Sequence, residues 1–231
     1  MSDPNPPRPA ERMGAREQLR RLAETFQPPI PPPLLAGSPD ARPASVLLLF
    51  SPVPHVAARS ADGLRASDLN VLLQVRARTL REHAGQVSFP GGRREKRDAD
   101  AVQTALREAQ EETGIDPSGV EVLAELPPVP LAVSNHSVTP VVGWWPFPGP
   151  LTAVDQAETT RVWQVEVAQL LDPASRFMSV FRRGSATFRS PAFDVDGIIV
   201  WGFTAMLLDR VFDDAGWAIP WDATRDRDIV P

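Results

Sequence analysis

The stretch FPGGRREKRDADAVQTALREAQEETGI, residues 89–115, decides how this chain is interpreted. It predicts a short strand that ends at two consecutive glycines, then a charged loop, then the most clearly marked helix of the sequence, over residues 100–113. Asp100 is a good N-cap, and Gln103 three residues later completes a capping box. Gly114 follows the last turn, where glycine suits the left-handed conformation that ends many helices.

The predicted helix carries three carboxylates on one face. Glu108, Glu111 and Glu112 are spaced i, i+3 and i+4, so their charges repel one another unless a cation is bound between them. Mg²⁺ prefers carboxylate oxygens and commonly binds substrate phosphates at the same time. A solvated acidic face without a ligand is the alternative interpretation of these residues.

Basic residues gather immediately before the helix. Residues 76–97 contain seven Arg or Lys and two acids, whereas residues 98–115 contain five acids and one base. A basic surface beside an acidic helix suits a metal-bound polyphosphate, because carboxylates hold the metal while Arg and Lys neutralise the remaining phosphate oxygens. Surface charge without a function is the alternative here too.

Two motifs carry a resemblance to a known family. The sequence REAQEETGI, residues 107–115, resembles the second half of the Nudix box at every position, and Gly92 matches the glycine that opens the box. The preceding stretch LLQVRARTLREHAGQVSFPGG, residues 72–92, is similar to the extended signature of the coenzyme A pyrophosphatase subfamily. We therefore interpret the chain as resembling a Nudix hydrolase of that subfamily.

The chain departs from the family pattern at two places. The segment between Gly92 and Arg107 is one residue longer than in the family's box, so either Asp98 or Ala99 takes the place of the first glutamate of the box. Ala77 stands where the subfamily usually has serine after an arginine. The first departure concerns the outermost carboxylate and leaves the glutamate trio intact.

The resemblance implies a fold and a reaction. The fold is α/β of the α+β kind, a Nudix-type α/β/α sandwich with a mixed sheet and the box as a loop–helix–loop. The reaction is hydrolysis of a phosphorus-containing anhydride with Mg²⁺ or Mn²⁺ as cofactor, yielding 3′,5′-ADP and 4′-phosphopantetheine from coenzyme A or the acyl form from its thioesters. The alternatives are a Nudix hydrolase of ADP-ribose or NADH, and a non-catalytic Nudix-fold ligand sensor.

Candidate site residues follow from the same resemblance. The metal ligands it implies are Glu108, Glu111 and Glu112, and Arg107 would orient a glutamate through an ion pair. The catalytic set is Arg107, Glu108, Glu111 and Glu158, in which the general base is either Glu108 or the later carboxylate Glu158, itself equally well interpreted as an exposed loop residue. The candidate substrate-binding residues are Arg76, Arg81, His83, Gln86, Gly91 and Gly92.

Composition limits the remaining possibilities. The chain has 231 residues, a formal net charge of -5, three His and no Cys. The lack of Cys excludes disulfides, a thiolate nucleophile and Cys-ligated zinc. The acidic balance argues against a nucleic-acid partner, and no apolar run is long enough to span a membrane. Finding no secretory signal, we expect a cytoplasmic enzyme with a small-molecule substrate, and leave a homodimer open.

Strand and helix patterns alternate along the chain. We expect a Pro-rich N-terminal arm over residues 1–43 with a short helix, a Nudix hydrolase domain over residues 44–221, and a polar tail over residues 222–231. Strands are predicted at residues 46–50, 70–74, 87–89, 120–126, 139–144, 162–167, 186–195 and 198–201. Helices besides 100–113 are predicted at residues 15–26, 168–171 and 204–212. We expect Trp144 and Trp145 to belong to the core.

Overall fold

A computed structural model describes residues 13–29, 38, 40–56, 63–77, 85–131, 134–154, 157, 159–183 and 186–229. Three of the candidate site residues, Arg81, His83 and Glu158, lie outside the described residues. No helix in the described part of the chain is long and apolar enough to cross a lipid bilayer.

Every strand and helix predicted from the sequence is present. The helices are α1 (Ala15–Thr25), α3 (Ala101–Thr113), α4 (Val167–Leu171) and α5 (Phe203–Asp214). The strands are β1 (Arg42–Pro52), β2 (Leu69–Arg76), β3 (Val87–Ser88), β4 (Gly91–Arg93), β5 (Glu121–Glu125), β6 (Val129–Leu131), β7 (His136–Trp144), β8 (Thr159–Glu166), β9 (Arg176–Arg183), β10 (Ala186–Val195), β11 (Ile198–Val200) and β12 (Asp226–Asp228). Strands β4, β6, β9 and β12 were not predicted from the sequence.

Strand β1 is the centre of the main sheet. It pairs in parallel with β7 from Arg42 opposite His136 to Phe50 opposite Trp144. It pairs antiparallel with β4 near its start and with β2 near its end. Strands β3 and β8 pair with β2, and β5 and β6 pair with β7, all antiparallel. The sheet is therefore mixed, as predicted.

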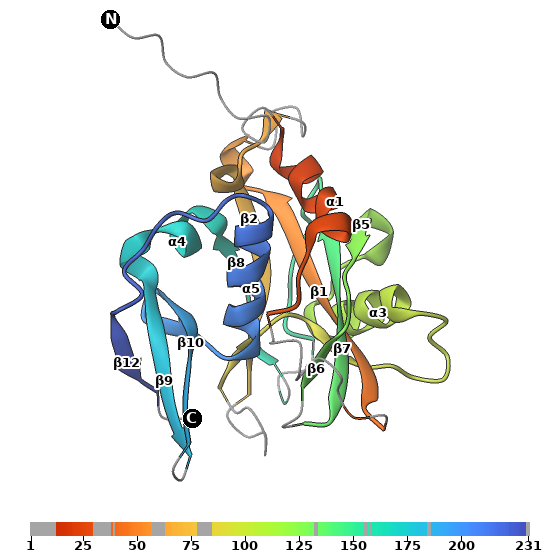
Figure 1. The fold of residues 1–231 in the computed structure, drawn as a ribbon. Coiled ribbons are helices and arrows are strands. Elements are labelled where there is room, and N and C mark those ends of the chain that lie inside the picture. The colour runs from red at the N-terminus through yellow and green to blue at the C-terminus, as the bar shows by residue number, and fades with distance from the viewer. Residues whose placement is uncertain are drawn as a thin grey trace, which may run out of the picture.

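The two faces of the main sheet are covered by different helices (Figure 1). Leu47 and Leu49 of β1 join a core cluster with α3, whereas Leu48 and Phe50 join a larger cluster with α1, α4 and α5. This alternation follows from the two-residue period of a strand, which turns successive side chains to opposite faces. Helices on both faces make the predicted α/β/α sandwich, so the expected fold class is confirmed.

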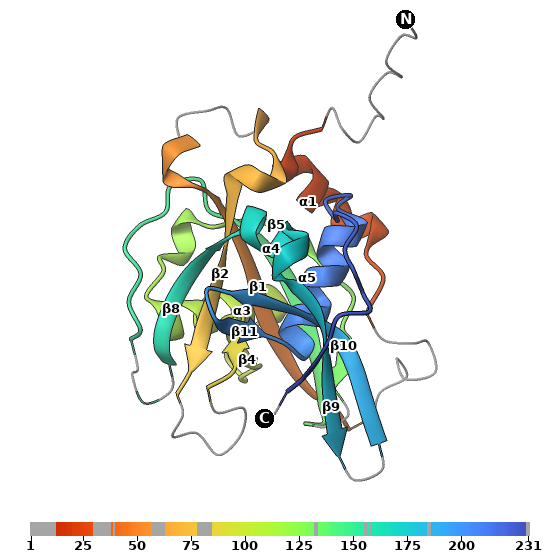
Figure 2. The same cartoon turned by 90° about the vertical axis from the view of Figure 1, so that its left-hand side faces the viewer.

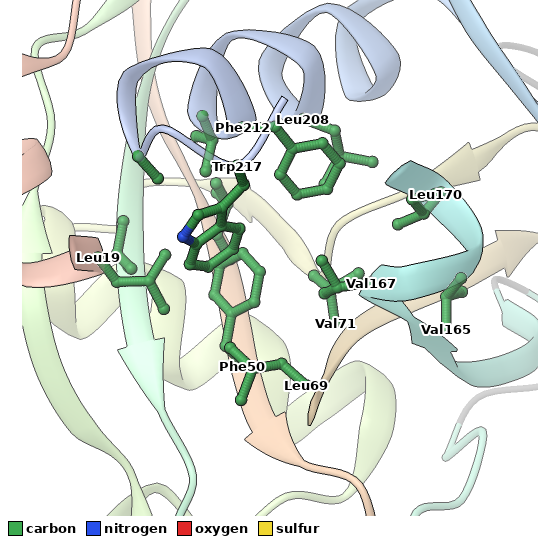
Figure 3. Packing of buried hydrophobic residues seen from close by; sticks show 14 of the residues in the cluster. Leu19, Phe50, Leu69, Val71, Val165, Val167, Leu170, Leu208, Phe212 and Trp217 are labelled. Atoms are coloured by element: carbon green, nitrogen blue, oxygen red, sulfur yellow. The ribbon is translucent and has the colours of Figure 1, made fainter. Parts of the chain in front are cut away.

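Trp217 connects α1 to the larger core cluster (Figure 3). Its ring lies edge-on to that of Phe50, with the centroids 5.9 Å apart, and its Nε1 donates a 2.7 Å hydrogen bond to Oε1 of Gln18. Leu19 and Leu22 on the same helix are fully buried. The predicted N-terminal helix thus packs against the body of the protein and does not stand apart from it.

A second sheet, with strand order β11-β10-β9-β12, packs its inner face against α5 (Figure 2). Strands β10 and β11 form the predicted hairpin, and its turn residues Asp196 and Gly197 both have positive φ, as an Asp-Gly turn requires. Strand β12 lies within the predicted polar tail and pairs in parallel with β9. Trp144 and Trp145 are buried, as expected.

The packing of α1 predicts a large stability effect for one of its leucines. Leu22 is fully buried, so Leu22→Ala is expected to lower the free energy of unfolding by about 2–5 kcal/mol through lost contacts and a cavity. Glu24→Ala, at an exposed position of the same helix, should change it by less than about 0.5 kcal/mol. Urea unfolding of both variants tests this, and equal small effects would mean that α1 is not part of the cooperative core.

Candidate functional site

Helix α3 begins and ends where the sequence predicts. The backbone N–H of Gln103 donates a 2.8 Å hydrogen bond to Oδ1 of Asp100, and the Gln103 side chain accepts a 2.9 Å bond from the N–H of Ala99. Gly114 takes the left-handed conformation, with φ of 70°. Ala105 and other small residues of the helix pack on the main sheet, which fixes the direction in which its glutamates project.

Glu112 is the most buried of the three glutamates on α3, with 8% of its surface exposed. Its Oε2 accepts a 2.8 Å hydrogen bond from the N–H of Gly91 in strand β4. Burial raises the pKa of Glu112 to about 7, although Gly91, the amide of Gln74 and the charge of Arg76 act in the opposite direction. Ionisation of Glu112 therefore lowers the stability of the folded protein unless a cation binds its carboxylate.

Gly91 has no room for a side chain, and a side chain on Gly92 would displace the carboxylate of Glu108. A Cβ on Gly91, whose φ is +157°, would lie 2.3 Å from the carbonyl oxygen of Ser45. A Cβ on Gly92 would lie 2.4 Å from Oε1 of Glu108. The two glycines thus let the backbone of β4 lie directly against both β1 and the glutamates of α3.

Arg107 is the centre of the charge network in the loop. Its Nε and Nη2 donate a pair of hydrogen bonds to the two carboxylate oxygens of Asp98, at 2.9 and 3.0 Å. Its Nη2 also donates to Oε1 of Glu108 at 3.0 Å, and its Nη1 donates to Oε2 of Glu111 at 2.8 Å. One guanidinium therefore fixes three carboxylates, and the expected ion pair to a glutamate is present.

Asp98 is the most heavily hydrogen-bonded carboxylate among the described residues of this loop. Its carboxylate also accepts hydrogen bonds from the N–H of Glu95 at 2.8 Å and from the hydroxyl of Thr104 at 3.1 Å. The hydrogen bonds from Arg107, foremost, hold the pKa of Asp98 well below its usual range. Of the two residues aligned with the first glutamate of the box, Asp98 supplies a carboxylate, and that carboxylate is committed to Arg107.

The three glutamates of α3 are not equivalent. Glu111 is half exposed and accepts hydrogen bonds from Arg97 and Arg107. Within the described residues, no three acidic or imidazole side chains converge as a ready cation site. Glu108 and Glu112 are the two that face the glycine turn, the first beside Gly92 and the second on the N–H of Gly91. Burial raises the pKa of Glu108, against the opposite effect of Arg107.

Strand β2 forms the opposite side of the site. Arg76 lies at its end, and the buried Nε of its guanidinium makes no hydrogen bond. The carbonyl of Gln86 accepts a 2.9 Å bond from the N–H of Arg76, which brings that candidate residue to the same edge. Sequence reasoning missed Gln74 and Thr159, whose side chains are buried and hydrogen-bonded to each other at 3.1 Å. The signal was a glutamine between the apolar Leu73 and Val75 in a strand predicted to be buried.

Comparison with known proteins places this chain among proteins of one family. The NUDIX domain family matches residues 54–180. The chain is 34% identical over 196 residues to the uncharacterized Nudix hydrolase NudL of Photorhabdus laumondii, covering 84% of this chain and 95% of that protein. It is 41% identical over 147 residues to the uncharacterized Nudix hydrolase NudL of Escherichia coli K12, covering 63% of this chain and 74% of that protein.

Among solved structures, the Nudix hydrolase RenU of M. smegmatis is similar to this chain with a TM-score of 0.43 and 23% sequence identity. The alignment covers 55% of this chain and 71% of RenU.

The burial of Asp98 predicts a destabilised Asp98→Asn variant. An amide keeps the shape but turns an N–H group toward the donors of Arg107, so several charge-assisted hydrogen bonds are lost. We expect a loss of about 2 kcal/mol or more in the free energy of unfolding. Asp100→Asn is the matched control, because asparagine caps a helix as well as aspartate does. Urea unfolding that finds the two variants equally stable would contradict the anchoring role of Asp98.

The raised pKa of Glu112 predicts a pH-dependent stability cost. Between about pH 4.5 and 7 the folded protein holds a proton that the unfolded chain has released, so Glu112 lowers stability increasingly as the pH rises, by about 3 kcal/mol above pH 7. In a chelating buffer, Glu112→Gln should therefore gain stability over the unsubstituted protein from pH 5 to pH 8. Urea unfolding at both pH values measures the gain, and an equal difference at both would contradict the prediction.

Proposed function

This chain belongs to the Nudix hydrolase family, and from that premise we propose that it cleaves the diphosphate of coenzyme A or its thioesters. The family's general reaction is hydrolysis of pyrophosphate bonds in nucleoside diphosphate derivatives. The observation that carries the proposal is the buried carboxylate of Glu112 on the N–H of Gly91, with Glu108 beside Gly92 and Arg76 at the edge of the same site.

The residues around the glycine turn fit a divalent cation, Mg²⁺ or Mn²⁺. Glu112 is a buried carboxylate whose ionised form is disfavoured without further positive charge. Glu108 reaches the position that a side chain on residue 92 would fill. These two carboxylates would hold the cation together with backbone oxygens near Gly92, and Glu111 would act on it at most through water. A hard cation prefers such oxygen donors and commonly keeps several waters.

The chain's own residues prepare the site for an anionic substrate. A bound cation would neutralise phosphate charge and lower the pKa of its water. Arg107 fixes Glu108 by an ion pair, so that this carboxylate keeps one orientation during the reaction. Arg76 supplies positive charge from strand β2. The base that takes the proton of the attacking water is either Glu108 or Glu158.

Coenzyme A is favoured by residues 72–92, the part of the chain that is similar to the subfamily signature. Its described residues, 72–77 and 85–92, belong to β2 and β3 and to the glycine turn that follows β3. Arg81 and His83 belong to it and are our further candidates for contacts to the coenzyme's phosphates. A Nudix hydrolase of ADP-ribose or NADH is the second candidate. A ligand sensor ranks last, because Glu108, Glu111 and Glu112 are all present.

Product analysis tests the proposal. The purified protein is incubated with Mg²⁺ or Mn²⁺ and, separately, coenzyme A, ADP-ribose and NADH. We expect 3′,5′-ADP from coenzyme A, and a loss of at least about 100-fold in rate for Glu112→Gln, because the ligand carboxylate is gone. Glu24→Ala, on the exposed face of α1, serves as the control and should retain full activity.

Each result has one interpretation. Cleavage of ADP-ribose or NADH in place of coenzyme A would keep the hydrolase and reject the substrate. Absence of cleavage with both metals, in a protein that still binds coenzyme A, would favour the ligand sensor.

A further inference from the structure

Gln74 is a buried polar side chain whose amide nitrogen has no hydrogen-bond acceptor of regular geometry. It lies on β2, opposite Ser88 of β3, and is fully buried. Its Nε2 makes no hydrogen bond of regular geometry. A buried amide donor without a partner costs roughly 1–3 kcal/mol, so such a group is usually retained for a reason other than stability.

A neighbouring strand fixes which end of the Gln74 amide is free. The hydroxyl of Thr159, at the start of β8, donates a 3.1 Å hydrogen bond to Oε1 of Gln74, and both side chains are buried. With Oε1 occupied, only the donor Nε2 is left for a further partner. Leu72 lies two residues before Gln74, on the same face of β2, and belongs to one core cluster with Ala109 of α3. Glu112 follows Ala109 by one turn, so it belongs to the part of α3 that this face of β2 meets, and its side chain interacts with the amide of Gln74. An ionised carboxylate only accepts hydrogen bonds, so this orientation is also the chemically matched one.

We propose that Gln74 is a positioning residue for Glu112, and that Thr159 holds Gln74 in the orientation this requires. The inference rests on the proposed cation site. Gly91 fixes one oxygen of Glu112 from the side of the glycine turn. Gln74 approaches the same carboxylate from β2, so that the two donors together define how Glu112 presents its remaining lone pairs to a cation.

The arrangement explains why an unsatisfied amide is kept in the core. A cation held by Glu112 would fix the position of this carboxylate, so that one of its oxygens can accept a hydrogen bond of regular geometry from the Nε2 of Gln74. Partners of this kind, one step behind the ligands of a metal, commonly contribute 10- to 100-fold to metal affinity. A role only in packing would leave metal affinity unaffected and would appear in the stability of the metal-free protein.

Two conservative substitutions separate these roles. Gln74→Met keeps an unbranched side chain of similar length and removes the amide, and Thr159→Val removes only the hydroxyl. The dissociation constant for Mn²⁺ is measured from the free-ion EPR signal, without substrate, and thermal unfolding is recorded in EDTA. We expect about 10-fold weaker Mn²⁺ binding for Gln74→Met and a smaller loss for Thr159→Val, with unfolding midpoints in EDTA near that of the unsubstituted protein.

Two further variants are controls. Thr159→Ser keeps the hydroxyl and should restore the Mn²⁺ affinity that Thr159→Val loses. Gln164→Met removes a glutamine from β8 that hydrogen-bonds Ser51 at 3.4 Å and lies opposite Leu72, two residues before Gln74 on β2. It should bind Mn²⁺ as the unsubstituted protein does. Equal losses in the two Gln→Met variants would overturn the assignment to Gln74.

The outcomes distinguish this inference from the function on which it rests. An unsubstituted protein that neither binds Mn²⁺ nor hydrolyses a nucleoside diphosphate would reject the cation site itself. An unsubstituted protein that does both, alongside a Gln74→Met variant of unchanged Mn²⁺ affinity, would reject only the positioning role. A Gln74→Met variant whose unfolding midpoint in EDTA falls by more than about 5 °C would assign Gln74 to packing.

Discussion

The site depends on a carboxylate that is buried before any cation is bound. Desolvation of Glu112 disfavours its charged form, whereas the N–H of Gly91, the amide of Gln74 and the charge of Arg76 favour it. None of these neutralises the carboxylate. A carboxylate with a strongly raised pKa is typical of functional sites, because a positively charged ligand stabilises its ionised form on binding. The absence of a Cβ at two consecutive positions is what allows the backbone to approach closely enough.

In the loop before α3, by contrast, arginines and carboxylates form ion pairs with one another. Arg107 is largely buried and forms ion pairs with Asp98, Glu108 and Glu111, so its charge is neutralised within the protein. Arg97 is likewise paired with Glu95 and Glu111. The loop also contains a turn in which the N–H of Asp98 donates a 3.1 Å hydrogen bond to the carbonyl of Glu95. Ion pairs therefore hold this loop, and one of them, from Arg107, holds Glu108.

Most of the fold and part of the site could be predicted from the sequence. Helix α3 could be predicted to within a residue because its signals are local, a capping Asp100 and a terminating Gly114. Strand β12 could not, because its exposed Asp-Arg-Asp sequence has no strand preference and pairs only because β9 offers an edge. The spacing of the glutamates indicated a shared face. It could not indicate that Arg97 and Arg107 engage Glu111 while Glu112 is buried, because that division depends on tertiary contacts.

The same division of charges constrains where a polyphosphate can be recognised. In the basic loop that precedes α3, Arg93 donates to His136 and Arg94 to backbone carbonyls, so these two side chains are held within the loop by neutral acceptors. The guanidinium of Arg76, with an Nε that makes no hydrogen bond, stands on the opposite side, at the start of the connection that follows β2. Because α3 carries the glutamates expected to act on the diphosphate of any such substrate, we expect selectivity among nucleoside diphosphates to depend on residues outside this helix, Arg76 among them. A family whose members share one helix can in this way differ in substrate through the strand that faces it.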